Sequence, residues 1–172
     1  MRNNITILVI NGSPGAGKST TAGAISDVLY QKMILHALID FDELGLVHPK
    51  PKDLPIQWMN LKSVLENFSK VEDLEKIIIP IAIDSQEILD QLKSCLPNAE
   101  WIICELLANK DELLKRVTNR EPDDYWREKL RKLVINYADR DETTKFGELK
   151  VRTDDKTIGE VANEILLTIK WI

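Results

Sequence analysis

The sequence predicts an α/β fold, in which helices cover both faces of a parallel sheet of five strands. Short apolar segments alternate with longer stretches of helical periodicity throughout the 172 residues, and this alternation is typical of parallel sheets. No internal repeat or low-complexity linker interrupts the pattern. The length is sufficient for one substantial core, so we expect a single domain over residues 1–172.

Five apolar segments are expected to form the strands. They cover about 5–11, 34–39, 75–79, 101–107 and 148–152. The first is rich in β-branched residues, as buried parallel strands are. Pro80 has no N–H group to donate to a sheet, so the third strand should end close to it.

Helical periodicity is found between these segments, at about 18–32, 56–70, 88–96, 109–119, 123–139 and from 157 onward. Thr157 and Glu160 have the spacing of a capping box, which would begin the last helix. The expected buried face of that helix consists of Ile158, Val161, Ala162, Ile165 and Ile169. The expected apolar stripe of the helix before it consists of Trp126, Leu130, Leu133, Val134 and Tyr137.

The composition restricts the function. A formal net charge of −5 argues against a protein that coats nucleic acid, because such proteins need a basic face. Cys95 and Cys104 lie in apolar segments, which indicates buried thiols in a reducing compartment rather than a disulfide or a metal pair. The first residues are too few for the charged part of a secretion signal, and no apolar run approaches the ~18 residues of a membrane span. We expect a cytoplasmic monomer or homodimer that binds neither nucleic acid nor membrane.

A glycine-rich segment between the first expected strand and the first expected helix carries the strongest functional signal. It matches G-x-x-x-x-G-K-[ST], and strand–loop–helix is the context in which such a loop binds phosphate. Its glycines let backbone N–H groups turn inward, and the helix N-terminus adds about half a positive charge. The residues expected to bind a nucleoside triphosphate are Gly12, Ser13, Pro14, Gly15, Ala16, Gly17, Lys18, Ser19 and Thr20.

Two side chains of this loop have specific expected roles. Lys18 can reach the β- and γ-phosphates, and the hydroxyl of Ser19 can bind Mg²⁺. The alternative is a glycine-rich turn that binds nothing, and the complete match in its strand–helix context argues against it.

Two aspartates follow the second expected strand, at the edge of the sheet where the loop lies. Asp40 and Asp42 are two residues apart, so in an extended segment their carboxylates would point the same way. Phosphoryl transfer needs a group that orients the attacking hydroxyl and another that supports the metal. We assign Asp40, which is nearer the sheet, to the metal and Asp42 to the acceptor hydroxyl. The alternative is a solvated acidic turn at the end of a strand.

Arginines after the fourth expected strand form a second group of candidates. Arg116 and Arg120 lie four residues apart on one expected helix, where like charges repel unless an anion lies over them. They could clamp the transferring phosphoryl group or stack on a base, so both are catalytic candidates. The alternative for Arg116 is an ion pair with Glu112. Residues 120–140 are a candidate helical lid, and its arginines are expected on a solvated face: Arg127, Arg131 and Arg140.

The remaining polar candidates are weaker. Asp84 could bind metal after the third strand, but it lies beyond the expected end of that strand, where capping the next helix is favoured. Trp58 and Asn60 could line an acceptor pocket, and a place in the core is an equal alternative for the tryptophan. The two histidines have no carboxylate or cysteine at metal-ligand spacing and are expected to be structural or exposed: His36 and His48.

The first 45 residues resemble those of the P-loop small-molecule and nucleotide kinases. The segment Gly12–Thr20 is similar to the loop of adenylylsulfate, shikimate and gluconate kinases, and Leu38–Asp42 resembles the shikimate-kinase segment in which one aspartate assists Mg²⁺ and the next holds the acceptor. Arg116 and Arg120 resemble arginines beside the lid of this group. The resemblance implies a three-layer P-loop NTPase fold, with strand order 2-3-1-4-5 and a small helical lid. It also implies Mg²⁺-dependent transfer of phosphate from ATP to a small-molecule hydroxyl or phosphate.

The segments that bind the acceptor in these kinases differ here. Shikimate kinases have a glycine pair after the third strand, where this chain has Pro80–Ile83. Adenylylsulfate kinases have an arginine after their Asp-x-Asp, where Glu43 and Leu44 stand, and residues 40–70 lack the arginines of nucleoside-monophosphate kinases. The Asp-x-Asp-x-Leu, proline-rich loop and Asn-Leu helix are most similar to those of uncharacterised bacterial kinase-like ATPases. The resemblance therefore supports the phosphate donor and leaves the acceptor unidentified.

The leading hypothesis is an ATP-dependent phosphotransferase acting on a small-molecule acceptor. In it Lys18 stabilises the transferring charge and Asp42 positions the attacking oxygen. The alternative is a nucleotide-binding switch or regulatory ATPase without kinase activity, which the missing Walker-B carboxylate favours. A guanine-specific GTPase is disfavoured, because the acid of Asn109–Glu112 falls one position too early for an Asn-Lys-x-Asp segment.

Overall fold

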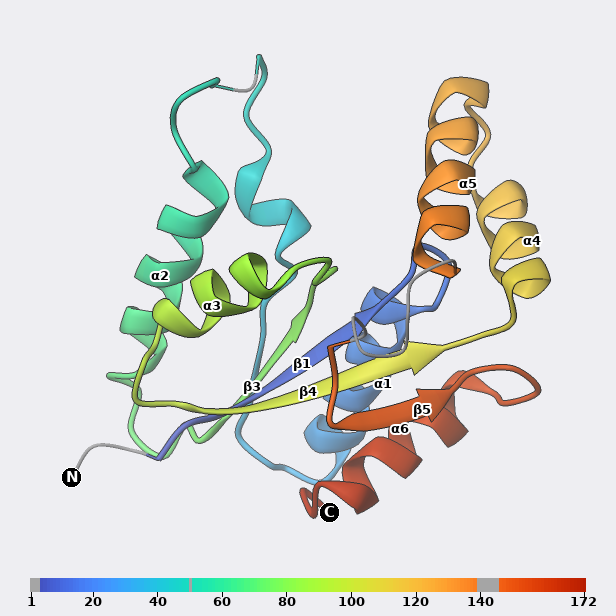
Figure 1. Cartoon of the computed structure of the whole chain (residues 1–172). Helices are drawn as coiled ribbons and strands as arrows, with labels where there is room; N and C mark the ends of the chain where they lie inside the picture. Colours follow the sequence, from blue (N-terminus) through green and yellow to red (C-terminus); the bar gives the residue numbers. More distant parts are fainter. Residues whose placement is uncertain (1–3, 50, 139–145) are drawn as a thin grey trace.

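The computed structural model describes residues 4–49, 51–138 and 146–172. Its strands form one sheet in the order β2-β3-β1-β4-β5, and neighbouring strands are parallel. The strands are β1 (Thr6–Gly12), β2 (Ala37–Leu38), β3 (Lys76–Pro80), β4 (Glu100–Leu107) and β5 (Leu149–Arg152). The predicted α/β class and strand order are therefore confirmed (Figure 1).

Helices cover both faces of this sheet. They are α1 (Lys18–Gln31), α2 (Ile56–Phe68), α3 (Gln86–Ser94), α4 (Lys110–Arg120), α5 (Asp124–Ala138) and α6 (Ile158–Thr168), with a short 3₁₀ helix η1 (Asp42–Gly45) after β2. Helices α1 and α6 lie on one face, and α2 and α3 lie on the other (Figure 1). Helices α4 and α5 pack together beyond the carboxyl end of β4. The loops at the carboxyl ends of the strands therefore lie between two groups of helices, α2 with η1 on one side and α4 with α5 on the other (Figure 1).

Alternate side chains of β1 enter the two apolar clusters of the core. Leu8 and Ile10 pack with α1 and α6, whereas Ile7 and Val9 pack with α2 and α3. All four side chains are fully buried. Burial on both faces explains why the middle of this strand, Ile7–Ile10, is continuously apolar instead of alternating with polar residues.

The second strand is shorter than the sequence predicts. The strand consists of Ala37 and Leu38, although the apolar segment covers 34–39. The N–H group of Ile34 donates instead to the carbonyl oxygen of Leu29 (2.9 Å), because this residue belongs to the turn that ends α1. The apolar run therefore includes both a turn and an edge strand.

Strand β3 ends at Pro80, as predicted. The carbonyl oxygen of Ile78 accepts a hydrogen bond from Ile39 (3.0 Å) on the β2 side. Pro80 is two residues further along the same side of β3, and β2 has already ended at Leu38. A residue without an N–H group is tolerated there because no ladder bond is required of it.

The last two helices differ from the expected faces. The capping box of Thr157 and Glu160 is present, but Ile158, the first residue of α6, is 47% exposed. Leu166 is buried in its place. In α5, Trp126 and Leu133 are exposed, because this helix packs against α4 rather than on the sheet.

Both cysteines are free and buried, as predicted. Burial raises the pKa of the Cys104 thiol to about 12, and the nearby charges of Glu105 and Glu164 act in the same direction. In the part of the chain that the structure describes, no helix has the length and apolarity needed to cross a membrane.

Candidate active site

The glycine-rich loop connects β1 to α1 and is closely packed from two sides. Gly12 has a φ of +142°, and a Cβ atom there would lie 2.7 Å from the carbonyl oxygen of Leu106 in β4. Gly15 has a φ of +83°, and its Cβ would lie 3.0 Å from the carbonyl oxygen of Leu113 in α4. A side chain at either position would be both strained and obstructed. The two glycines therefore let β4 and α4 approach the loop directly.

The side chain of Lys18 returns to the loop that precedes it. Its ammonium group donates to the carbonyl oxygens of Gly12 (3.0 Å) and Ser13 (3.3 Å). Ser13 is almost completely buried, and among the described residues its hydroxyl has no hydrogen-bond partner. A buried hydroxyl without a partner is costly, so Ser13 has an unused hydrogen-bonding group in this loop.

Charges from three other segments act on the ammonium group of Lys18. Burial lowers its pKa, and the charge of Arg120 adds to this effect. The carboxylates of Asp42, Glu105 and Asp40 act in the opposite direction and favour the charged form, with Asp42 the strongest of the three. The charges of three site residues predicted from the sequence, Asp40, Asp42 and Arg120, therefore act on this lysine.

Asp40 and Asp42 lie near Lys18, but the predicted geometry of their segment is wrong. The chain turns after β2 instead of staying extended, because Oδ1 of Asp40 accepts the N–H of Asp42 (3.0 Å) where η1 begins. Such a side-chain turn is a common alternative to extended structure for aspartate. The side chain of Asp42 is exposed and that of Asp40 is partly buried.

Helix α2 holds η1 through polar and aromatic contacts. Trp58 packs on Phe41 with ring centroids 4.7 Å apart. Gln57 Nε2 donates to the carbonyl oxygen of Phe41 (3.3 Å), and Asn60 Nδ2 donates to that of Leu44 (2.8 Å). Trp58 and Asn60 therefore support the segment that carries Asp42.

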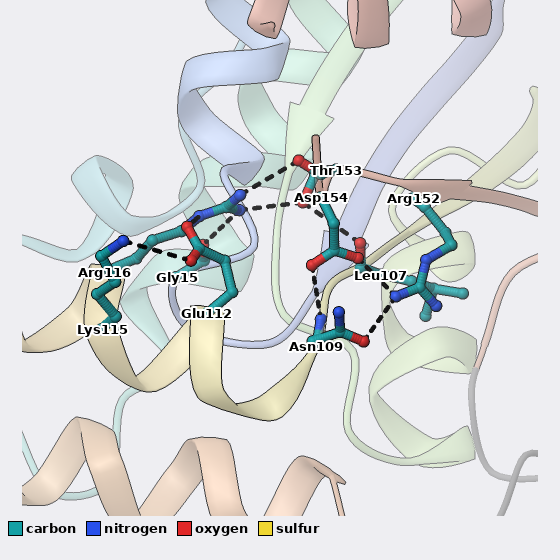
Figure 2. Close-up of polar contacts among 9 residues, drawn as sticks. All are labelled: Gly15, Leu107, Asn109, Glu112, Lys115, Arg116, Arg152, Thr153 and Asp154. Carbon is teal, nitrogen blue, oxygen red and sulfur yellow. Dashed lines mark hydrogen bonds and ion pairs between the residues drawn. The ribbon is translucent and has the colours of Figure 1, made fainter. Parts of the chain in front are cut away.

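Arg116 joins three segments around the loop (Figure 2). Its Nε donates to Glu112 Oε1 (3.0 Å), the ion pair that the sequence offered as an alternative. Its Nη1 donates to Thr153 Oγ1 (3.0 Å) and makes a longer bond to the carbonyl oxygen of Gly15 (3.4 Å). Its Nη2 donates to the carbonyl oxygen of Thr153 (3.2 Å). The guanidinium group is therefore a bridge between α4, the loop before α6 and the glycine-rich loop.

Arg120 ends α4 and is exposed. It makes no hydrogen bond or ion pair with another described residue, in contrast to Arg116. Both arginines line a cavity of about 320 Å³ between the glycine-rich loop, α4 and the start of α6. Its other lining residues are Gly15, Ala16, Gly17, Thr20, Thr21, Thr153, Lys156, Ile158 and Val161.

A polar junction that the sequence did not indicate follows Thr153, which is one of the residues that line this cavity (Figure 2). Asp154 accepts the backbone N–H of Asn109 (2.8 Å) and a bond from Arg152 Nη2 (2.6 Å). The hydrogen bond from Asn109 holds the pKa of Asp154 below its ordinary value, and Arg152 contributes to the same shift. The only available signal was topological, because the carboxyl ends of β4 and β5 had to meet at this edge.

The remaining predicted residues lie outside the site. Asp84 is exposed, and the prediction that it caps the next helix is wrong, because Ser85 Oγ accepts the N–H of Ile88 (3.3 Å). His36 lies within hydrogen-bond distance of Ser26 Oγ (2.7 Å) and is structural, while His48 is exposed. Of the arginines in the candidate lid, Arg127 bonds to Asp124 and Arg131 to Thr118, and both are partly buried rather than on a fully solvated face. Arg140 lies outside the described residues.

The side chains near the loop could supply some, but not all, of the oxygen ligands that Mg²⁺ needs. Among the described residues, no group of three or more histidine, cysteine, aspartate and glutamate side chains is placed to hold a metal ion. Ser19 is exposed at the start of α1, and Asp40 offers a carboxylate near the loop lysine. Mg²⁺ usually takes one or two protein oxygens and completes its shell with phosphate and water. The residues present fit that mode of binding.

Comparison with solved structures shows which proteins share this fold. No family model and no curated protein matches the sequence. The structure is similar to APS kinase of Mycobacterium tuberculosis in complex with AMPPNP and APS (TM-score 0.67, 16% identity, 98% of this chain and 99% of that one). It is also similar to a gluconokinase from Sinorhizobium meliloti 1021 (0.64, 17%, 99% and 94%) and to shikimate kinase from Acinetobacter baumannii (0.59, 16%, 98% and 95%). The chain therefore has the P-loop kinase fold over nearly its whole length.

Proposed function

We propose that this protein is a Mg²⁺-dependent phosphotransferase that moves the γ-phosphate of ATP to a hydroxyl group of a small molecule. The observation that carries the proposal is the convergence on Lys18 of the glycine-rich loop and of the two aspartates after β2. Phosphoryl transfer depends mainly on positioning and on stabilising charge, and this arrangement offers groups for both. The kinases that share the fold support the same reaction class.

The donor nucleotide would bind along the start of α1. The loop N–H groups and Lys18 would hold its phosphates, and the unused hydroxyl of Ser13 would donate to one of them. The cavity beside Arg116 would take the base and sugar. Arg120 has no competing partner among the described residues, so it is the better arginine for contact with the phosphates. Arg116 would then act mainly by holding the walls of the cavity together.

Mg²⁺ would be held by Ser19 and, directly or through water, by Asp40. When bound, the ion would neutralise charge on the β- and γ-phosphates. Asp42 would accept a hydrogen bond from the acceptor hydroxyl and orient its oxygen toward the phosphate held by Lys18. Its exposed position on η1, which Trp58 and Asn60 hold in place, supports this role.

The charge around Asp42 favours an acceptor without an anionic group. Asp42 and Glu43 are both exposed on η1, and residues 40–70 contain no arginine. The amide side chains of Gln57 and Asn60 are already bonded to backbone oxygens. A phosphate or carboxylate on the acceptor would be repelled here and would lack the usual bidentate partner. We therefore infer a neutral or cationic hydroxyl compound.

A nucleotide-dependent switch is the second candidate. It is favoured by the end of β3, where the sequence Lys76–Pro80 holds no acidic residue, and by the exposed position of Asp84 beyond it. A switch would bind nucleotide at the same loop, but no small molecule would accelerate its release of ADP.

The experiment is a screen of ADP release with ATP and Mg²⁺ in the presence of possible acceptors. Nucleosides and aminocyclitol antibiotics represent the neutral and cationic class, and nucleotides, sugar acids, shikimate and adenylylsulfate the anionic class. Lys18→Ala serves as the blank, and Lys32→Ala, at the exposed far end of α1, as the matched control. The proposal predicts that one neutral or cationic compound raises ADP release in the wild type and in Lys32→Ala only. Release that no compound raises would favour the switch.

A further inference from the structure

The side chain of Asn11 holds three segments together immediately before the glycine-rich loop. It is 1% exposed. Its Nδ2 donates to the carboxyl group of Glu105 in β4 and to the carbonyl oxygen of Phe146 (3.1 Å), and its Oδ1 accepts the N–H of Ile83 (2.8 Å). Both donors and the acceptor of this amide are therefore used, by β4, by the segment before β5 and by the loop after β3.

The side chain of Glu105 is fully buried in the protein. Its exposed fraction is zero. The backbone of Gly147 lies over it, since a Cβ atom on that glycine would be 2.7 Å from Glu105 Cβ. Burying a carboxyl group is expensive unless hydrogen bonds compensate for the lost water. The amide of Asn11 supplies such a bond.

The pair of Asn11 and Glu105 lies at the end of the sheet where the glycine-rich loop begins. Asn11 and Glu105 are register partners in β1 and β4, and the next pair along the ladder is Gly12 and Leu106. The chain leaves β1 toward one side of the sheet, to β2, and leaves β4 toward the other side, to β5. Parallel sheets of this type bind ligands at the point between two such strands. A shift of Asn11 would pass directly to Gly12, whose carbonyl oxygen holds Lys18 and which has no free space against Leu106.

We propose, on the basis of the proposed function, that Glu105 is a positioning residue for phosphate binding. It touches no phosphate itself. Through Asn11 it fixes the place where Gly12 leaves the sheet, and so the place from which the loop N–H groups and Lys18 meet the phosphates. The carboxyl charge of Glu105 is also one of the charges that act on the Lys18 ammonium group.

The test exchanges the amide and the carboxyl group between positions 11 and 105. Asn11→Asp keeps the size of the side chain and the acceptor for Ile83, but it removes both donors and sets two carboxyl groups against each other. The double variant Asn11→Asp, Glu105→Gln restores one donor between positions 11 and 105 and restores the net charge. The matched control is Glu100→Gln, which removes a carboxyl group from the amino end of the same strand, where Glu100 bonds to Thr6 (3.1 Å).

The readouts are the dissociation constants of Mg-ADP and of inorganic tripolyphosphate, with circular dichroism as the check on folding. Tripolyphosphate occupies only the loop, so a positioning role predicts that Asn11→Asp weakens both ligands by the same factor, about tenfold, which corresponds to about 1.4 kcal/mol. In the double variant both dissociation constants should return to within about threefold of the wild-type values. In Glu100→Gln they should equal the wild-type values.

Three results would overturn the inference. These are a folded Asn11→Asp variant that binds both ligands like the wild type, one that loses ADP but keeps tripolyphosphate, and a double variant no better than the single one. If Asn11→Asp does not fold, the Glu105→Gln variant is used instead. We expect it to bind tripolyphosphate about threefold or more weakly than the wild type. If its affinity equals that of Glu100→Gln, the positioning role of Glu105 is rejected. If the wild type binds neither ligand, the proposed function itself fails, which is a different result.

Discussion

Arg116 and Thr153 are joined by two hydrogen bonds, from Nη1 to Oγ1 (3.0 Å) and from Nη2 to the carbonyl oxygen (3.2 Å). They are 37 residues apart in the sequence, in α4 and in the loop before α6. The same guanidinium group reaches the carbonyl oxygen of Gly15. One planar, five-donor side chain thus closes the edge of the cavity proposed for the nucleotide base.

Arg116→Ala should weaken both the fold and nucleotide binding. The half-buried guanidinium loses its bonds to Glu112, Thr153 and Gly15, so the free energy of unfolding should fall by about 1–3 kcal/mol and ADP affinity by about tenfold. Urea denaturation and calorimetry measure the two effects. Lys115→Ala is the matched control: Lys115 is the neighbour that pairs with the same Glu112 at 3.9 Å and is 70% exposed. Equal effects of the two substitutions would contradict the bridging role.

Asp42→Asn should reduce turnover without preventing nucleotide binding. An amide cannot accept the proton of the acceptor hydroxyl, and general-base groups contribute about 10²-fold or more to rate. The measurement is kcat for the acceptor identified by the screen, together with the dissociation constant of ADP. Glu43→Gln, the next exposed carboxylate on η1, is the control and should keep its activity. If both variants retain full turnover, Asp42 is not the orienting group.

Asp154→Asn should lower stability at neutral pH and have a smaller effect in acid. Asn109 and Arg152 favour the charged form of Asp154, so its pKa in the folded protein lies below the unfolded value of about 3.9. The stabilisation is therefore present above that pH and is lost as the pH falls through the folded pKa. We expect a difference of about 1–2 kcal/mol at pH ~7 that narrows below pH ~3.

Urea unfolding at the two pH values checks this prediction. Asp155→Asn is the control, because Asp155 is the adjacent exposed aspartate. A loss for Asp154→Asn that stays constant across the acid range would show that the carboxyl charge is not what stabilises the junction.

The sequence predicted best what depends on neighbouring residues. The strand, loop and first helix could be recognised because the apolar run, the glycines and Lys18 follow one another directly. After β2 the sequence favoured an extended segment, with a turn as the alternative, and the turn forms because the side chain of Asp40 accepts the N–H of Asp42. The cap of α3 was displaced by one residue, from Asp84 to Ser85, because both residue types are good caps.

Contacts between distant segments could not be predicted. Asn11 and Glu105 are 94 residues apart, and their hydrogen bond depends on the register of β1 against β4. In the sequence Glu105 is a single acid within an apolar strand, and nothing nearby indicates its partner. The bond between Arg116 and Thr153 likewise depends on how α4 and the loop before α6 meet, so the sequence led to a nucleotide contact for Arg116, with the Glu112 ion pair as the alternative.

The most direct test of the central claim is calorimetric titration with a non-hydrolysable ATP analogue and Mg²⁺. The claim is that Lys18 and the loop before it bind the phosphates. It predicts one nucleotide per chain, a dissociation constant at least about 100-fold weaker in Lys18→Ala, and wild-type binding in Lys32→Ala. Wild-type protein that binds no nucleotide, or Lys18→Ala protein that binds it equally well, would contradict the claim.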